Sequence, residues 1–283
     1  MNRRWNTVAI AGLILFAALP LLLSMGYSLL YSFGITGALN TGFTFDHWEK
    51  LFSEGAIFSS FLYSNVLAFV TVALSVFIGL YISLRHGNAF KKRSLSYIIY
   101  LPLAFPAMVS AFFFFQFLSK AGILSRSFYQ VGITNSIQSF PDLVNDQYGI
   151  GIILAHLFIC APFFTLLFIN RIETENIYDY LSLSQTLGAT KRQALRKIAV
   201  PMLLQKTFTN IILYFIFIFG SYEIPILLGR SNPEMISVLA VRKLQKFNLF
   251  DIPQGYAVAV LYTAFVLAIV LILLKKQRLA YDI

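Results

Sequence analysis

Long apolar stretches separated by short polar segments run through the whole chain. A helix needs about 20 mostly apolar residues to cross a bilayer, and six stretches meet this requirement. They cover approximately residues 7–33, 57–84, 95–118, 149–170, 207–228 and 255–274. The connections 34–56 and 119–148 are long enough for short helices but too small to fold alone. The pattern therefore predicts an all-α membrane protein with six transmembrane helices in a single domain of residues 1–283.

The composition supports this interpretation and excludes an ordinary soluble protein. The chain is 58% hydrophobic and 12% charged, whereas soluble domains have roughly 45–50% apolar and about 25% charged residues. The net charge of +10 does not indicate nucleic-acid binding, because the basic residues lie between the apolar stretches instead of on one face of a folded domain. We therefore expect the chain to lie in the lipid bilayer and to bind no nucleic acid.

The first apolar stretch resembles a signal peptide, since Met-Asn-Arg-Arg precedes it. It is longer than the roughly 7–15 apolar residues of a signal peptide, so we interpret it as a retained membrane helix. Of the 22 lysines and arginines, 15 lie on the side of both termini and of the loop 171–206, and seven lie on the other side. Because cytoplasmic loops carry the excess of basic residues, both termini and this loop are predicted to be cytoplasmic.

Prolines interrupt three of the predicted helices. Pro102 and Pro106 lie in the third, Pro162 in the fourth and Pro225 in the fifth. Each removes a backbone donor and kinks its helix, so a freed carbonyl needs a partner from protein or from water in a cavity. Kinked helices suit a path that opens and closes, although prolines are in general commoner in membrane helices than in soluble ones. The pair in the third helix, followed by Phe112 to Phe115, is the more specific indication of a gate.

The loop 171–206 is the longest charged and amphipathic passage between two apolar stretches. Gly188 can adopt backbone angles that strain other residues, which permits a sharp corner. Thr190 and Gln193 have the spacing of a capping box and predict the start of a helix. Pro201 stands where the fifth membrane helix is expected to begin, a position at which its missing donor costs little. Together these residues predict two short helices joined at a corner.

Apolar side chains flank the predicted corner on both sides. Those before Gly188 form a knob suited to a socket on another protein, or the apolar side of a helix that lies on lipid headgroups. Those after it form a stripe at helical spacing that is expected to rest on the membrane helices. The knob comprises Ile177, Tyr178, Tyr180, Leu181 and Leu183, and the stripe comprises Ala194, Leu195 and Ile198.

This loop resembles the coupling-loop motif of permease subunits of bacterial ATP-binding-cassette (ABC) importers. The usual motif is Glu-Ala-Ala, three residues, Gly, nine residues and Ile-x-Leu-Pro, and Gly188, Ile198 and Pro201 stand at matching spacing. Other segments in the style of the family are Thr186 to Ala189, Leu101 to Pro106, which is similar to its proline-rich third helix, and Phe219 to Gly229, which is similar to the fifth helix of its polyamine-type branch.

The resemblance implies a permease domain over the whole chain that hydrolyses no ATP itself. ATP and Mg²⁺ would be bound by two copies of a separate ATPase subunit, so no cofactor is expected in this chain. A second permease subunit and an external solute-binding protein would complete an importer in the bacterial inner membrane. The residues that the resemblance assigns to the ATPase-coupling loop are Ile177, Tyr178, Tyr180, Leu181, Ser182, Leu183, Ser184, Leu187, Gly188, Ala189, Ile198 and Pro201.

The chain departs from the family motif at its acidic position. Ser182, Leu183 and Ser184 occupy the places of Glu-Ala-Ala. In the family this glutamate is expected to pair with a basic group on the ATPase, and no upstream acid of this chain matches its position. The missing acid points to a heteromeric transporter in which a different permease chain carries a better-formed motif. A self-paired permease with an altered socket is the alternative.

Glu223 is the acidic residue that lies well within an apolar stretch. Burying an ionisable group in a membrane is costly, so such a residue is a functional candidate. It fits a counter-ion for a cationic solute, or a hydrogen-bonded structural carboxylate near Arg230. The resemblance favours a polyamine-like solute, with iron, thiamine or a small oxyanion as alternatives. The candidate translocation path comprises Ser221, Tyr222, Glu223, Pro102, Pro106 and Gln116, with Asn65, Asn170 and Asn210 as further polar candidates.

His156 and Cys160, the single cysteine, are four residues apart and share one face of the fourth predicted helix. Two possible ligands without a third are weak support for a metal site. We therefore expect packing or a polar contact between helices at His156, and no metal.

Motifs of other function classes are absent from the sequence. It contains no Gly-x-x-x-x-Gly-Lys-Ser/Thr, His-Glu-x-x-His or Gly-x-Ser-x-Gly, so neither an ATPase nor an intramembrane hydrolase is supported. The remaining alternative is a helical channel or scaffold without ATP coupling. Such a protein would explain the hydropathy and the prolines, but it would leave the glycine, the capping box and the Pro201 spacing unexplained.

Overall fold

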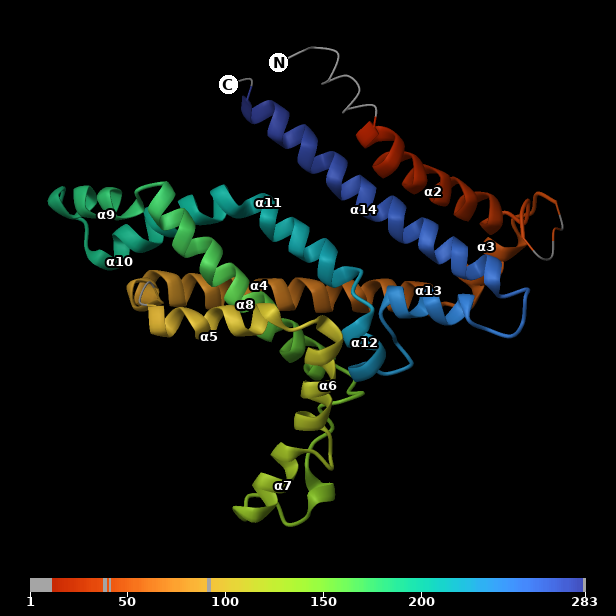
Figure 1. The fold of residues 1–283 in the computed structure, drawn as a ribbon, viewed down its shortest axis with the longest axis horizontal. Coiled ribbons are helices and arrows are strands. Elements are labelled where there is room, and N and C mark those ends of the chain that lie inside the picture. Colours follow the sequence, from red (N-terminus) through yellow and green to blue (C-terminus); the bar gives the residue numbers. More distant parts are fainter. Residues whose placement is uncertain (1–11, 38–39, 41, 91–92, 282–283) are drawn as a thin grey trace. The chain divides into compact units, whose positions relative to one another are not determined.

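The computed structural model describes residues 12–37, 40, 42–90 and 93–281. These residues form helices joined by turns and contain no strand, which confirms the predicted all-α fold (Figure 1). In chain order the elements, with η for a short 3₁₀ or π helix, are η1 (Ile14–Ala18), α2 (Leu19–Ser32), α3 (Asp46–Ser53), α4 (Ala56–Phe90), α5 (Arg93–Ala104), α6 (Ala107–Leu118), α7 (Ile123–Gln130), η2 (Ile137–Ser139), α8 (Ile150–Thr174), α9 (Ile177–Thr186), α10 (Lys191–Ala194), η3 (Leu195–Ala199), α11 (Val200–Phe219), α12 (Glu223–Leu228), α13 (Ile236–Leu244) and α14 (Ile252–Tyr281).

Among the described residues, six helical stretches are long and apolar enough to cross a membrane, as the hydropathy predicts. The third contains a turn at residues 119–122 between α6 and α7, and the fifth joins α10, η3 and α11. The beginning of the first predicted helix lies outside the described residues. The six stretches are Ile14–Ser32, Ala56–Gly87, Ala107–Gln130, Ile150–Thr174, Lys191–Phe219 and Ile252–Lys276.

The third predicted helix, 95–118, is two helices, so the predicted interruption is confirmed at Pro106, whereas Pro102 lies inside α5. Phe105 and Pro106 separate α5 from α6, and Pro106 is extended (φ −57°, ψ 146°). A proline disfavours helical angles in the residue before it and donates no backbone hydrogen bond, which explains the break. Pro162 has no such effect, since α8 continues through it.

The fifth predicted helix, 207–228, is also interrupted, as its proline indicated, but the break lies before Pro225 and not at it. Residues 220–222, which we call the helix break, separate α11 from α12. Pro225 lies in the first turn of α12, where a helix does not use the backbone N–H that proline lacks. An uninterrupted helix would need that donor, and Gly220 at the end of α11 favours termination because glycine is a poor helix former.

Pro201 lies in the first turn of α11, as the sequence predicts, but α11 continues a helical run that begins before it. A continuous helical run starts at Lys191 and passes through α10, η3 and α11. The π turn η3 ends just before the proline, where the Val200 N–H donates to the Leu195 carbonyl five residues back. This wider turn relieves the clash between a proline ring and the carbonyl four residues before it, so the helix continues.

The chain divides into two compact units. The first joins Met1–Phe61 to Ile236–Ile283, and the second is Leu62–Met235. In the first unit α2 packs on α14, and the rings of Tyr31 and Tyr256 stack there with their centroids 4.3 Å apart. All the candidate site residues lie in the second unit.

The second unit is built around α8. Helices α5, α6, α9, α11 and α12 all contact it. The backbone of α4 also approaches it closely, because a Cβ added to Gly79 would lie 2.9 Å from the Phe164 Cβ. Phe164 and Phe168 are fully buried. Helix α8 is therefore positioned to connect the corner that follows it with the helix break that follows α11.

Candidate functional site

The predicted corner is present after α8. We call α9, the turn at Gly188 and α10 the corner (residues 177–194). Asn176 turns the chain in the left-handed region (φ 48°) between α8 and α9, and Gly188 turns it again (φ 90°) between α9 and α10. Nothing lies within 4 Å of a Cβ added to Gly188. The glycine is therefore required by the backbone conformation and not by crowding.

Backbone and capping hydrogen bonds fix both sides of the Gly188 turn. The Gly188 N–H donates to the Gln185 carbonyl and the Ala189 N–H donates to the Ser184 carbonyl, both at a distance of 3.0 Å. This is the Schellman pattern. Thr190 then caps α10: its Oγ1 accepts from the Gln193 N–H (3.3 Å), and Gln193 Oε1 accepts from the Thr190 N–H (2.9 Å). Both the turn at Gly188 and the predicted capping box are confirmed.

Helix α9 has a buried face and an exposed face, and the predicted knob residues divide between them. Ile177 and Leu181 are buried with Ser184, so the prediction that all five apolar residues form an exposed knob is wrong. Outward-facing apolar residues occur at intervals of three and four, which places them on one side of the helix. They are Tyr180 (50% exposed), Leu183 (59%) and Leu187 (81%).

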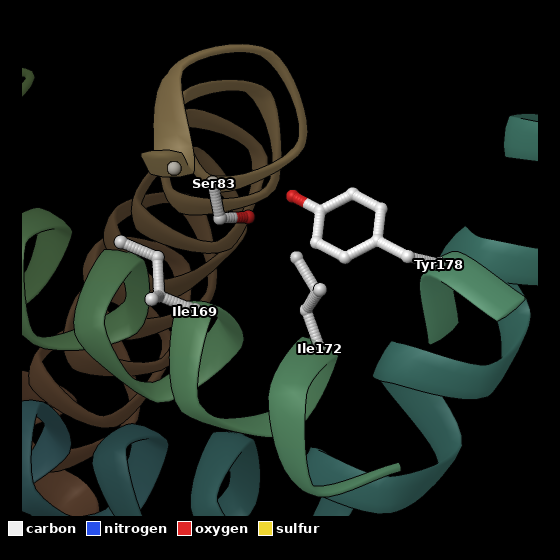
Figure 2. A pocket seen from close by; sticks show the side chains of 5 residues that line it. Ser83, Ile169, Ile172 and Tyr178 are labelled. Carbon is white, nitrogen blue, oxygen red and sulfur yellow. The ribbon is translucent and has the colours of Figure 1, made fainter. Parts of the chain in front are cut away.

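Tyr178 connects α9 to the membrane helices. Its ring lies over a small hollow lined by Ser83 and Gly87 of α4 and by Ile169 and Ile172 of α8 (Figure 2). A Cβ added to Gly87 would lie 3.6 Å from Ile169 Cγ1 and 3.9 Å from the Tyr178 hydroxyl oxygen. The tyrosine, which is 40% exposed, thus lies against the ends of two helices with one side chain, and we call this arrangement the Tyr178 joint.

The stripe after Gly188 faces inward, as predicted, but the element it contacts is α9 and not the membrane helices on which it was expected to rest. Ala194 is buried, Leu195 and Ile198 are half-buried, and Ala199 extends the buried set. Both α10 and η3 contact α9. The two arms of the corner therefore pack on each other. The exposed basic residues of this segment are Lys191, Arg192, Arg196 and Lys197.

An ion pair at the end of α8 was not predicted from the sequence. Glu175 Oε2 lies 2.9 Å from Lys206 Nζ on α11, and Glu175 Oε1 lies 3.9 Å from Arg171 Nη1. At the position of the family's glutamate, the exposed Ser182 donates its hydroxyl to the Tyr178 carbonyl of its own helix (2.9 Å). The side chain at that position is therefore a neutral one bonded within α9.

The path candidates lie on several elements, and the structure brings only some of these together. Helix α6, which carries the exposed Gln116, contacts α12, at whose first position Glu223 is exposed. Ser221 and Tyr222 are half-buried in the helix break. Pro102 is buried within α5 and is not among the exposed candidates. Of the other candidates, Pro106 and Asn170 are exposed, and Asn65 and Asn210 are half-buried.

Comparison with known proteins identifies the family. Residues 72–278 match the family described as "Binding-protein-dependent transport system inner membrane component". The chain belongs to this family. It is accordingly a multi-pass inner-membrane permease subunit of an ABC importer, and the alternative of a channel or scaffold unrelated to such a transport system is set aside.

Individual relatives of this permease are distant. It is 23% identical over 271 residues to the "Probable ABC transporter permease protein y4oQ" of Sinorhizobium fredii (strain NBRC 101917 / NGR234), covering 94% of this chain and 86% of that protein. Its fold is similar to a chain in the crystal structure of a bacterial ABC transporter involved in the import of the acidic polysaccharide alginate (TM-score 0.71, 19% identity, covering 98% of this chain and 96% of that one). A second structure, of a bacterial alginate ABC transporter with alginate pentasaccharide-bound periplasmic protein, matches with a TM-score of 0.69 and 19% identity, covering 95% and 91% of the two chains.

Sequence reasoning placed the corner of this permease but missed its contacts. The lining of the Tyr178 joint carries a weak signal, because Ser83 and Gly87 are small residues one helical turn apart. Such spacing is common in membrane helices that pack closely. Nothing local indicates that Tyr178, and not Tyr180, turns toward them, so the joint becomes visible only in the folded chain.

Proposed function

We propose that this permease is one of two transmembrane subunits of an ATP-driven importer and that the corner receives the movement of the ATPase subunits. The observation that carries the proposal is the Tyr178 joint, combined with the exposed face of Tyr180, Leu183 and Leu187. One face of α9 is open for a partner, while Tyr178 contacts α4 and α8. A displacement of α9 is thereby passed to two membrane helices at once.

In this proposal the corner and both termini are cytoplasmic, in agreement with the excess of basic residues on that side. Two ATPase subunits bind and hydrolyse ATP with Mg²⁺, and this chain holds neither. Closure of the ATPases displaces α9, and the ends of α4 and α8 follow through Tyr178. The path then opens alternately to the two sides of the membrane, and an external solute-binding protein delivers the solute.

We infer that the second permease is a different chain. Ser182 stands at the position of the family's acid and donates to its own helix, so this subunit lacks the charge that would pair with a basic group on an ATPase. An importer in which one permease carries the acid and the other carries a neutral serine at this position would bind its two ATPases unequally. Mass measurement of the purified complex distinguishes a heterodimer of permeases from a homodimer.

For the solute we propose a small cation of the polyamine type, supported by the exposed carboxylate of Glu223 next to the helix break. Iron, thiamine, a small oxyanion or an acidic oligosaccharide, the last suggested by the alginate importers of similar fold, are the competing solutes. Uptake of radiolabelled spermidine by the complete importer should show a raised KM in Glu223→Gln. An unchanged KM, or no spermidine uptake by the native importer, contradicts the cationic assignment.

Substitution of Gly188 tests the coupling proposal. Gly188→Ala should cost roughly 1–2 kcal/mol in the corner, because an L-residue is strained at positive φ, and Gly188→Pro should abolish transport, since proline cannot adopt this φ. Gly132→Ala is a matched control: Gly132 also has positive φ (78°) and open space around it, but it lies outside the corner.

The measurements are solute uptake and solute-stimulated ATP hydrolysis by the reconstituted importer. Loss of both in Gly188→Pro, with the control active, supports the proposal. If no ATPase copurifies with the native chain, or if Gly188→Pro transports normally, the coupling role of the corner is wrong.

A further inference from the structure

The helix break leaves α12 as a short helix that cannot hold its own position. It has six residues, Glu223–Leu228, and helices this short are unstable unless other parts of the protein fix them. One fixed point is at its far end, where the Asn145 N–H donates to the Leu228 carbonyl (2.8 Å). Packing on α6 and α8 holds the buried face of α12, which comprises Ile224, Pro225 and Leu228. The part that remains to be fixed is the helix break, where the path candidates begin.

His156 of α8 fixes the helix break. It is 1% exposed, with Nδ1 2.9 Å from the Ile152 carbonyl oxygen and Nε2 3.0 Å from Ser221 Oγ. A carbonyl can only accept, so in the neutral ring Nδ1 carries the proton and Nε2 is an acceptor. The Ser221 hydroxyl therefore donates to Nε2, and the bond to Ile152 holds the ring in the required tautomer and orientation.

We propose that His156 is a positioning residue for the translocation path: it anchors Ser221 and thereby orients Tyr222 and Glu223 at the helix break. This inference rests on the proposed path, but the anchoring itself is independent of the solute. The Ser221 bond joins residues 65 apart in sequence, and it reaches the one place where the backbone between α11 and α12 is not helical. Movement of α8 can thereby reach the helix break through the His156 side chain, in addition to the packing of α8 on α12.

Two substitutions separate the two bonds of His156. Asparagine retains a donor near the position of Nδ1, whereas glutamine retains an acceptor near the position of Nε2. His156→Asn should therefore lose the anchor, and His156→Gln should keep it. Ser221→Ala removes the same bond from the other side. Thr165→Val is the matched control, because the buried Thr165 donates to the Ala161 carbonyl within α8 (2.8 Å) and its loss disturbs the same helix by one hydrogen bond.

The labelling rate of a single introduced cysteine measures how often α12 opens next to the helix break. Cys160 is the only cysteine of the sequence, so Cys160→Ala gives a chain without thiols. Ile224→Cys then places one thiol at a buried position of α12, which a small maleimide can reach only when the segment opens. The labelling rate is measured on the full chain in nanodiscs with its copurified partners, for the native His156 and for each variant.

His156→Asn and Ser221→Ala should each label on the order of tenfold faster, since an unsatisfied buried partner shifts the opening equilibrium by about that factor. The double variant should be no faster than either single variant, and His156→Gln and Thr165→Val should stay within about twofold of the native rate. Equal labelling rates for His156→Asn and His156→Gln, or a native labelling rate in His156→Asn, would overturn the proposal that His156 anchors Ser221. Uptake by the native importer is measured separately, so failure of the transport proposal leaves the labelling result interpretable.

Discussion

The corner and the helix break both redirect the chain beside α8, but different kinds of contact hold them. The corner is fixed by bonds between close neighbours in sequence, those of Gly188 with Gln185 and of Thr190 with Gln193. The helix break has a local bond from the Ser221 N–H to the Ile218 carbonyl, but its side-chain anchor is the distant His156, and the far end of α12 is held by the distant Asn145. A locally held element keeps its shape when it is displaced, whereas one held by distant partners responds when those partners move. The corner is thus suited to transmit force and the break to change with it.

The largest effect is expected at the junction of α8 with the segment before it. A Cβ added to Gly151 would collide with the Leu143 carbonyl oxygen, and a backbone oxygen cannot move aside without displacing its whole segment. For Gly151→Ala we therefore expect that most of the protein fails to fold, as judged by the amount of folded protein in gel filtration of the solubilised chain. Gly26→Ala, at a helical glycine with nothing within 4 Å, should be neutral. A normal amount of folded Gly151→Ala would mean that the segment of Leu143 can shift away from α8 at little cost.

The second prediction concerns the exposed face of α9. Leu187 is 81% exposed, so Leu187→Asp should leave the fold intact but reduce copurification of the ATPase by about tenfold or more, because a charge would enter an apolar contact. Leu181→Ala should do the reverse: it should lower the thermal stability of the permease, since it removes a buried side chain. Full ATPase binding by Leu187→Asp would show that this face is not the docking surface.

The third prediction tests whether the corner acts through the Tyr178 joint. Tyr178→Ala removes the side chain that lies against the ends of α4 and α8 and should reduce uptake several-fold while ATP hydrolysis continues. Tyr178→Phe keeps the ring and should retain most of the coupling, since it loses only the hydroxyl oxygen that approaches Gly87. The ratio of solute transported to ATP hydrolysed is the measurement. An unchanged ratio in Tyr178→Ala would assign the transmission to other residues of α9.

The smallest effect is expected at the Glu175–Lys206 ion pair. Glu175→Gln removes a pair that is partly exposed to solvent, and such pairs contribute about 0–1 kcal/mol. We expect a fall of a few degrees at most in the melting temperature, and no fall at high salt, where the pair is already screened. A larger loss that persists in salt would show that this long-range pair between the end of α8 and α11 contributes to the stability of the segment that carries the corner.

Features of the sequence that act over a few residues predicted their structures well. The six apolar stretches predicted the six candidate spans, and Gly188 with Thr190 and Gln193 predicted the corner. The prolines indicated that helices would be disturbed, but not how. Pro106 and Pro225 accompany breaks, Pro162 lies within an intact helix, and a π turn accommodates Pro201.

What the sequence determined by itself therefore rests on hydropathy and on hydrogen bonds between near neighbours, both of which need no other part of the chain. Only the tertiary structure decided which side of α9 is buried, that Tyr178 and not Tyr180 contacts α4 and α8, and that His156 meets Ser221. The physical reason is that burial and long-range hydrogen bonding depend on which helices pack together, and in a membrane protein nearly every helix is apolar on all sides.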